Sequence, residues 1–304
     1  MATPLLAPVQ QQAPAPCPPS TNEHHTHRDP AAVCSFSQAG GGREPATDVA
    51  GLQRTKADCT ACYCGGGNPT PDVAGIQWPT RGDCAYTSCY CEENVLQLVV
   101  QLRALVSPAH LNVVFISNPS QAVPIWRQRA SVDAGRDYQI WDYHVLLVLQ
   151  SPSQPAQPAL VFDLDTTLPF PCTLGEYQQQ ALLGGNDLLP RFQRFYRIVP
   201  APLLLQHFAS DRSHMRDTEG LWLQPPPPHP CITTADGRVN TLPSYLDFST
   251  AAIAGQGRLG GHQRQQRHLA AGSEGVTTAL VGSVQHPFGS IVDEPTFLAW
   301  FGLC

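Results

Sequence analysis

Residues 88–106 read SCYCEENVLQLVVQLRALV, and the rest of the chain is interpreted outward from this stretch. Its apolar side chains recur at three- and four-residue spacing, which predicts an amphipathic helix over residues 92–106 that ends at Ser107-Pro108. Cys91 stands directly before this helix, at or near its N-cap. The unpaired N–H groups of a first helical turn can stabilise a thiolate and hold an oxyanion. We therefore expect Cys91 to be a nucleophile with a lowered pKa.

The cysteine content also raises the alternative of a structural zinc site. Six of the 11 cysteines fall between residues 59 and 91, with spacings C-x2-C-x-C and C-x4-C-x-C. These spacings do not match the paired C-x2-C ligands of common zinc modules. Cys64 matches Cys91 in a partial repeat but precedes three glycines and no helix, so it lacks a means of activation. A zinc-bound interaction module over residues 59–91 remains the alternative, while the nucleophile interpretation needs no metal and no cofactor.

Composition excludes several classes of function. The chain has 304 residues and a formal net charge of -6, which argues against a general nucleic-acid binder. It contains no apolar run long enough for a membrane span, and its first residues do not resemble a secretory signal. We expect a soluble monomer in the cytosol, with the nucleus as a second compartment.

The chain is predicted to contain one folded domain. Residues 1–81 are rich in chain-breaking and polar residues and contain the partial repeat, so we expect a disordered, low-complexity extension. The domain is expected over residues 82–304, with a flexible insertion at residues 255–275. Five strand-like runs follow the helix, which predicts an α+β fold in which the helix packs on an antiparallel sheet. These runs cover residues 111–118, 122–128, 143–150, 159–166 and 192–199.

A base and an acidic partner for the cysteine can be sought in these strands. His144 begins an apolar run, and the turn-rich stretch after residue 150 predicts that this run forms a hairpin with residues 159–166. A turn centred between residues 154 and 155 places His144 opposite Asp165, and a slip of two residues places it opposite Asp163. Strand pairing leaves both carboxylates open as the partner of His144. A thiol, an imidazole and a carboxylate together are typical of nucleophilic catalysis.

At these residues the chain resembles the protein N-terminal glutamine amidohydrolase family. The resemblance covers roughly residues 82–248, and its blocks occur in the family's order. They are SCYCEEN (88–94), WDYHV (141–145), DLDT (163–166), LPFPC (168–172), FASDRSHM (208–215) and PPPPHPC (225–231). The residues from about 276 onward resemble the family only loosely.

The resemblance implies a fold and a catalytic triad. The fold would be α+β and similar to the papain and transglutaminase hydrolases. The nucleophile of the family falls on Cys91, its base on His144, and its acidic member on Asp163 rather than Asp165. The implied reaction removes the side-chain amide of a glutamine at the free N-terminus of a protein and releases ammonia through a thioester.

The resemblance further implies partners and a substrate site. The partners are proteins with N-terminal glutamine and a downstream arginyl-transfer machinery of the Arg/N-degron pathway. Candidates for binding the substrate are Asp142, Tyr143, Asp165 and Asp211, although a local ion pair with Arg212 explains Asp211 equally well. Because the same triad serves acyl transfer to an amine, a transferase is a further alternative.

Overall fold

The computed structural model describes residues 75–303, except for residues 134, 151–156, 184 and 255–285. The predicted insertion at 255–275 and most of the predicted extension at 1–81 lie outside the described residues. Within them, Trp78 packs edge-on against Phe162, with 5.3 Å between the ring centroids. The stretch before residue 82 therefore already contacts the core.

Six strands form one antiparallel sheet in the order β6-β5-β4-β1-β7-β8. A separate two-stranded sheet joins β2 to β3. The strands are β1 Leu111–Ser117, β2 Val123–Trp126, β3 Tyr138–Trp141, β4 His144–Leu149, β5 Leu160–Phe162, β6 Cys172–Thr173, β7 Phe195–Pro200 and β8 Ser290–Asp293. The predicted α+β class with an antiparallel sheet is confirmed.

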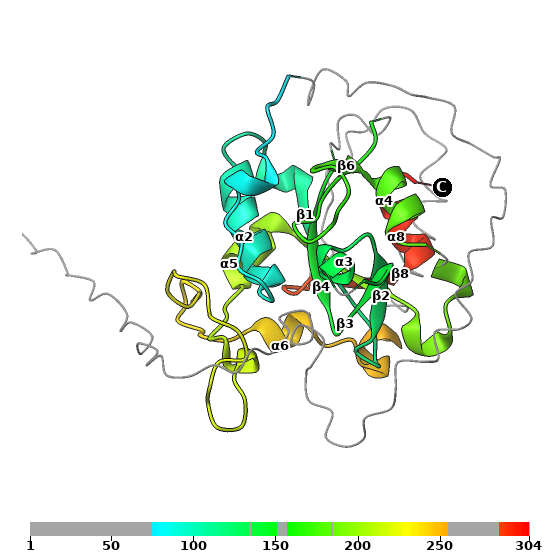
Figure 1. The fold of residues 1–304 in the computed structure, drawn as a ribbon. Helices are drawn as coiled ribbons and strands as arrows, with labels where there is room; N and C mark the ends of the chain where they lie inside the picture. Colours follow the sequence, from blue (N-terminus) through cyan, green and yellow to red (C-terminus); the bar gives the residue numbers. More distant parts are fainter. Residues whose placement is uncertain (1–74, 134, 151–156, 184, 255–285, 304) are drawn as a thin grey trace, which may run out of the picture.

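Helices cover both faces of the large sheet (Figure 1). On one face α2 and α5 pack with Val113 of β1 and Val145 of β4, and on the other α4 and α8 pack with Val114 and Leu146. Successive strand residues point to opposite faces, so the central strands are apolar on both sides. The helices are α2 Cys91–Leu102, α3 Arg129–Asp133, α4 Leu174–Gln180, α5 Ala201–His207, α6 Leu242–Tyr245 and α8 Glu294–Trp300.

Several predicted boundaries were wrong, and three strands were not predicted. Helix α2 includes Cys91 and ends at Leu102, because the chain closes with tight turns in which the N–H groups of Leu105 and Val106 both bond to the Leu102 carbonyl. Strand β5 stops at Phe162, where the chain turns away from β4. Strands β3, β6 and β8 were missed, because they are only two to four residues long and carry no clear alternation.

The C-terminal segment closes the edge of the sheet. Gly289 has a positive φ of 75°, and a Cβ at this position would overlap the Ile198 carbonyl, so only glycine lets β8 start this close to β7. The ring of Phe297 then stacks on Tyr196 at 4.2 Å. Phe297 and Phe301 are both buried in the core on this side of the sheet.

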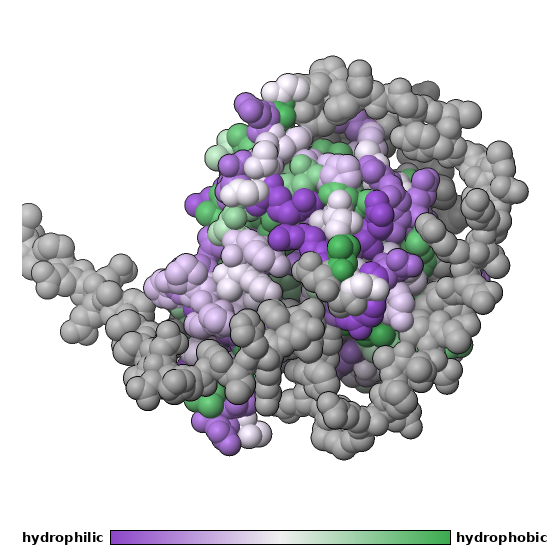
Figure 2. Space-filling model, viewed as in Figure 1, coloured by the Kyte–Doolittle hydropathy of each residue, from purple (hydrophilic) through white to green (hydrophobic). Residues whose placement is uncertain are grey.

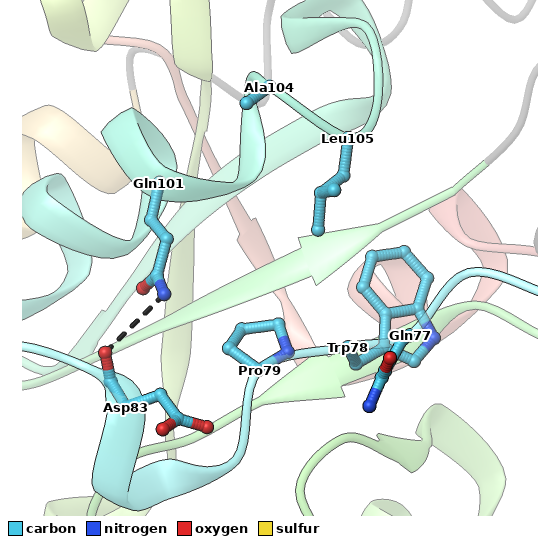
Figure 3. A pocket seen from close by; sticks show the side chains of 7 residues that line it. All are labelled: Gln77, Trp78, Pro79, Asp83, Gln101, Ala104 and Leu105. Carbon is cyan, nitrogen blue, oxygen red and sulfur yellow. Dashed lines mark hydrogen bonds between the residues drawn. The ribbon is translucent and has the colours of Figure 1, made fainter.

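A surface hollow lies away from the start of α2. It is lined by Gln77, Trp78, Pro79, Asp83, Gln101, Ala104 and Leu105 (Figure 3). Gln101 belongs to the last turn of α2, about 15 Å along the helix from Cys91 at its first turn. Polar and apolar residues are interspersed on the face seen in Figure 2. Among the described residues, no helix has the length and apolar character to cross a bilayer.

Candidate active site

The predicted pairing of His144 with an acidic residue is present in the structure. Leu147 lies opposite Phe162, and this register, continued along the strands, sets His144 opposite Asp165 as predicted. However, the chain turns after Phe162, and this turn brings the carboxylate of Asp163 to the imidazole of His144. His144 Nε2 and Asp163 Oδ1 lie 3.0 Å apart, and both side chains are buried. Of the two open candidates, Asp163 is the one that bonds the imidazole.

Asp163 is held from three further directions. Tyr177 of α4 donates its hydroxyl to Oδ2 at 2.8 Å, and Gln128 donates its amide to the same oxygen at 3.2 Å. The Asp165 N–H bonds Oδ1 at 2.9 Å. Burial alone would raise the pKa of Asp163, but the charge of His144 and these donors lower it to about 2. The carboxylate is therefore charged and fixed at neutral pH.

The imidazole of His144 is fixed in its plane and has one nitrogen free. The Trp141 indole stacks on it, with 5.0 Å between ring centroids and 23° between the planes. Burial acts to lower the pKa of His144, but the neighbouring Asp163 charge and hydrogen bond outweigh burial and raise it. Within the described part of the chain, His144 Nδ1 is buried and has no hydrogen-bond partner. This nitrogen is the one available to exchange a proton.

Cys91 occupies the first residue of α2, with 8% of the residue exposed. Its sulfur lies beside the backbone N–H of Val145, the residue that follows His144. The expectation of a lowered thiol pKa was wrong for this environment. Burial raises the pKa of Cys91 well above its usual range, and the carboxylates of Glu92, Asp165 and Asp142 raise it further. The free protein thus holds a neutral thiol beside the strand that carries His144.

The loop before Cys91 is clamped to α2. Asn94 accepts the Thr87 N–H and donates to the Thr87 carbonyl, both at 2.8 Å. Tyr90, the N-cap residue, makes no side-chain cap, so the first N–H groups of α2 are not capped by its side chain. This is the arrangement that an oxyanion site at the helix start requires.

A buried ion pair joins the start of α2 to the long loop after α5. Arg212 forms two hydrogen bonds with Glu93, at 2.9 and 2.8 Å, and both side chains are buried. Arg212 also donates to the carbonyl of Pro227 at 3.2 Å. The predicted ion pair of Arg212 with Asp211 was wrong, since the guanidinium binds Glu93 instead.

The four candidate substrate-binding residues divide into two groups. Asp142, Tyr143 and Asp165 lie around Cys91. The charges of Asp142 and Asp165 raise the pKa of its thiol, and the Tyr143 hydroxyl donates to Glu92 at 3.0 Å. Burial raises the pKa of Asp142 to about 6. Asp211 binds elsewhere, accepting the Ser213 N–H at 3.0 Å and the Asn240 amide at 2.9 Å. Its carboxylate braces its own loop.

His144, Asp163 and Asp165 carry side chains of the kind that bind cations. One ligand atom from each of His144, Asp163 and Asp165 lies within 4.8 Å of the others. However, His144 Nε2 bonds Asp163, and Asp165 accepts the Tyr86 hydroxyl at 2.6 Å. These bonds favour an orienting network over a metal centre. The alternative zinc module at residues 59–91 lies mostly outside the described residues.

Several residues of the site were not assigned a role from the sequence. Glu92 and Glu93 resembled ordinary acidic residues of an exposed first helical turn, yet they are 1% and 0% exposed. Tyr177 resembled a core residue of an amphipathic helix. For Gln128 and Arg212 the sequence carries no local signal, because each acts on a partner at least 35 positions away.

Comparison with known proteins shows which family the chain resembles. Residues 86–269, more than half of the chain, match the family model described as N-terminal glutamine amidase. The chain is 43% identical over 164 residues to protein N-terminal glutamine amidohydrolase of Homo sapiens, covering 53% of this chain and 78% of the relative. It is 42% identical over 164 residues to the Danio rerio protein of that name, covering 53% and 79%, and 43% identical over 170 residues to the Arabidopsis thaliana one, covering 55% and 76%.

Proposed function

The chain belongs to the N-terminal glutamine amidase family and is an amidohydrolase of N-terminal glutamine; we propose that Cys91, His144 and Asp163 carry out this reaction. The observation that supports the assignment is the buried 3.0 Å bond between His144 and Asp163. This bond occupies Nε2 and leaves Nδ1 of His144 without a hydrogen bond. The backbone N–H of Val145, the next residue along the strand, contacts the Cys91 sulfur.

The first half of the proposed reaction forms a thioester. His144 Nδ1 takes the proton from Cys91, and the thiolate attacks the side-chain carbonyl carbon of the substrate glutamine. The N–H groups at the start of α2 hold the resulting oxyanion, and one such donor typically contributes about 3–4 kcal/mol. His144 then returns the proton to the leaving nitrogen, and ammonia departs.

The second half consumes water. His144 removes a proton from a water molecule, the hydroxide attacks the thioester carbonyl, and the proton returns to the sulfur of Cys91. Asp163 keeps the imidazole in one orientation and stabilises the imidazolium formed in each half. The products are a polypeptide with N-terminal glutamate and a regenerated thiol.

Two broader features belong to the same proposal. A nucleophile at a helix start beside a strand that carries the base supports a papain- or transglutaminase-like fold. An N-terminal glutamate is the substrate that an arginyl-transferring activity would take next, which would link the reaction to the Arg/N-degron pathway.

Mass spectrometry of peptides tests the assignment. A Gln-initiated peptide should gain the mass difference between an amide and an acid, whereas a peptide with the same glutamine at an internal position should not. Cys91→Ala should abolish this conversion. Cys84→Ala and Cys64→Ala are controls that should retain it, since Cys84 donates to the Thr80 carbonyl and takes no part in the site. Equal loss from Cys91→Ala and either control would remove the assignment.

The same assay separates hydrolysis from acyl transfer. With a primary amine present, a transferase would attach it to the glutamine side chain and produce a heavier adduct. We expect glutamate as the product with or without the amine.

A further inference from the structure

Glu92 is a buried carboxylate in direct contact with the proposed nucleophile. Its Oε2 lies 3.7 Å from the Cys91 sulfur, and the residue is 1% exposed. A buried carboxylate is costly unless it is paired. Placed beside a thiol that must ionise, it is also unfavourable for catalysis, because two negative charges would share one small space. In the free protein this charge is balanced only in part, by the Tyr143 hydroxyl at 3.0 Å and by an ion pair with His214 at 3.5 Å.

The two oxygens of Glu92 differ in their contacts. Oε2 accepts the Tyr143 hydroxyl at 3.0 Å, but Oε1 is buried and accepts no hydrogen bond. His214 forms an ion pair with this oxygen, with 3.5 Å between Nε2 and Oε1, and its side chain is 24% exposed. A group that enters past His214 would meet an unsatisfied carboxylate oxygen next to the reacting sulfur.

The neighbouring carboxylates are less suited to receive a cation. Asp165 already accepts the short hydrogen bond from Tyr86. Asp142 accepts the N–H of Tyr143 at 2.8 Å, and with a pKa of about 6 it is partly neutral in mildly acidic solution. Glu92 combines a buried oxygen that accepts no hydrogen bond with a 3.7 Å contact to the sulfur of Cys91.

We propose that Glu92 accepts the α-ammonium group of the substrate, so that the cation that marks a free N-terminus also neutralises the carboxylate beside Cys91. The proposal rests on the proposed function and deepens it. Within a glutamine the α-nitrogen and the side-chain carbonyl carbon are at most about 5 Å apart, four bonds along the chain. A thiolate attacks from about 3–3.5 Å. Oε2, the other oxygen of the same carboxylate, lies 3.7 Å from the sulfur, so an ammonium at Oε1 is compatible with both distances.

This arrangement couples recognition to activation. Before substrate binds, Glu92, Asp142 and Asp165 face the thiol, Tyr143 and His214 contact Glu92, and the thiol keeps its proton. The entering ammonium offsets the charge of Glu92, and proton transfer from Cys91 to His144 becomes easier. An internal glutamine has an uncharged amide in place of the ammonium and cannot bring about this change.

Glu92→Gln tests the proposal, because glutamine keeps the size and can still accept from Tyr143 but carries no charge. With a Gln-initiated peptide, kcat/KM should fall about 10- to 100-fold, as expected for losing a hydrogen bond between charged groups. The preference for this peptide over its N-acetylated form should fall by the same factor. Without substrate, alkylation of Cys91 by iodoacetamide should reach its midpoint at lower pH than in the wild type.

Glu294→Gln is the matched control. Glu294 accepts two hydrogen bonds from buried Arg194 in a separate part of the core, so the variant should lower the melting temperature. It should leave both the preference for a free N-terminus and the alkylation midpoint unchanged. A Glu92→Gln protein that keeps the full preference, or an unchanged alkylation midpoint, overturns the proposal.

A measurement on the wild type covers the case in which Glu92→Gln does not fold. The substrate is a peptide that starts with a 4-carbamoylbutanoyl group, which is glutamine without its α-amine. We expect kcat to fall as well as KM to rise, because the thiol is not activated. A change in KM alone would contradict the coupling. If the wild type releases no ammonia even from a Gln-initiated peptide, the proposed function fails, which is a different outcome.

Discussion

The Tyr177 hydroxyl of α4 donates a 2.8 Å hydrogen bond to Asp163 Oδ2, while Asp163 Oδ1 lies 3.0 Å from His144. The imidazole of His144 is thus connected through one carboxylate to a helix on the far face of the sheet from α2. A carboxylate held from two sides can keep an imidazole in one orientation through both halves of a reaction.

Tyr177→Phe removes only this hydroxyl. We expect the unfolding free energy to drop by about 1 kcal/mol and kcat to fall roughly two- to tenfold, with little change in KM. Denaturant unfolding and steady-state kinetics measure the two effects. A rise in KM at constant kcat would show that Tyr177 acts on substrate binding instead.

Asp163→Asn is expected to be far more damaging to the reaction. An amide cannot stabilise the imidazolium and can hold the wrong tautomer, so kcat should fall about a thousandfold or more while the protein stays folded. Asp165→Asn should lower kcat less, because the imidazole bond belongs to Asp163. Comparable kcat values for the two variants would contradict the assignment of the acidic member.

These carboxylates show what a sequence can and cannot predict. The apolar runs and the position of the turn sufficed for the register of β4 and β5, and this register placed His144 beside an aspartate. Pairing could not choose between Asp163 and Asp165, because the choice depends on the turn after Phe162. Tyr177 and Gln128, which hold Asp163, come from segments whose packing is set only by the whole core. The burial of Glu92 was likewise hidden, since the loop that covers the start of α2 is more than 100 residues away.

Stability should depend on pH through Asp142. Burial raises its pKa to about 6 from an unfolded value near 3.9, so the folded chain binds more protons between these values. The contribution of Asp142 is therefore fully present below about pH 4 and is lost as the pH rises through about 6. Its upper bound is about 3 kcal/mol, since one pKa unit corresponds to about 1.4 kcal/mol.

Asp142→Asn isolates this contribution. The unfolding free energies of wild type and variant are measured at intervals from pH 4 to 7. The unfolding free energy of the variant should depend less on pH than that of the wild type. Asp163 has the opposite sign, with a folded pKa of about 2, and loses its stabilisation only as the pH falls below about 4. The two windows do not overlap, and an unchanged slope between pH 4 and 6 in Asp142→Asn would contradict the prediction.

The Arg212–Glu93 pair should be essential for stability. Arg212→Met leaves the buried Glu93 carboxylate with only the more distant His229, 3.6 Å away, and breaking a buried pair typically costs about 3–5 kcal/mol. The double variant with Glu93→Gln should recover part of this loss, because the uncompensated charge is gone. Chemical denaturation of the two single variants and the double variant completes the cycle, and additive losses would show that the pair is not coupled.

Trp141→Leu tests whether the stacked indole orients the base. The rings of Trp141 and His144 lie 5.0 Å apart at 23°, so the smaller side chain should free the imidazole to rotate. We expect kcat to fall about tenfold through loss of orientation, with a loss of about 2–4 kcal/mol in unfolding free energy from the emptied volume. Trp126→Leu is the matched control: it removes an indole that packs on Tyr138 in the same small sheet. The control should lose stability but keep kcat. If both variants lose kcat equally, the effect of Trp141 is on the fold and not on His144.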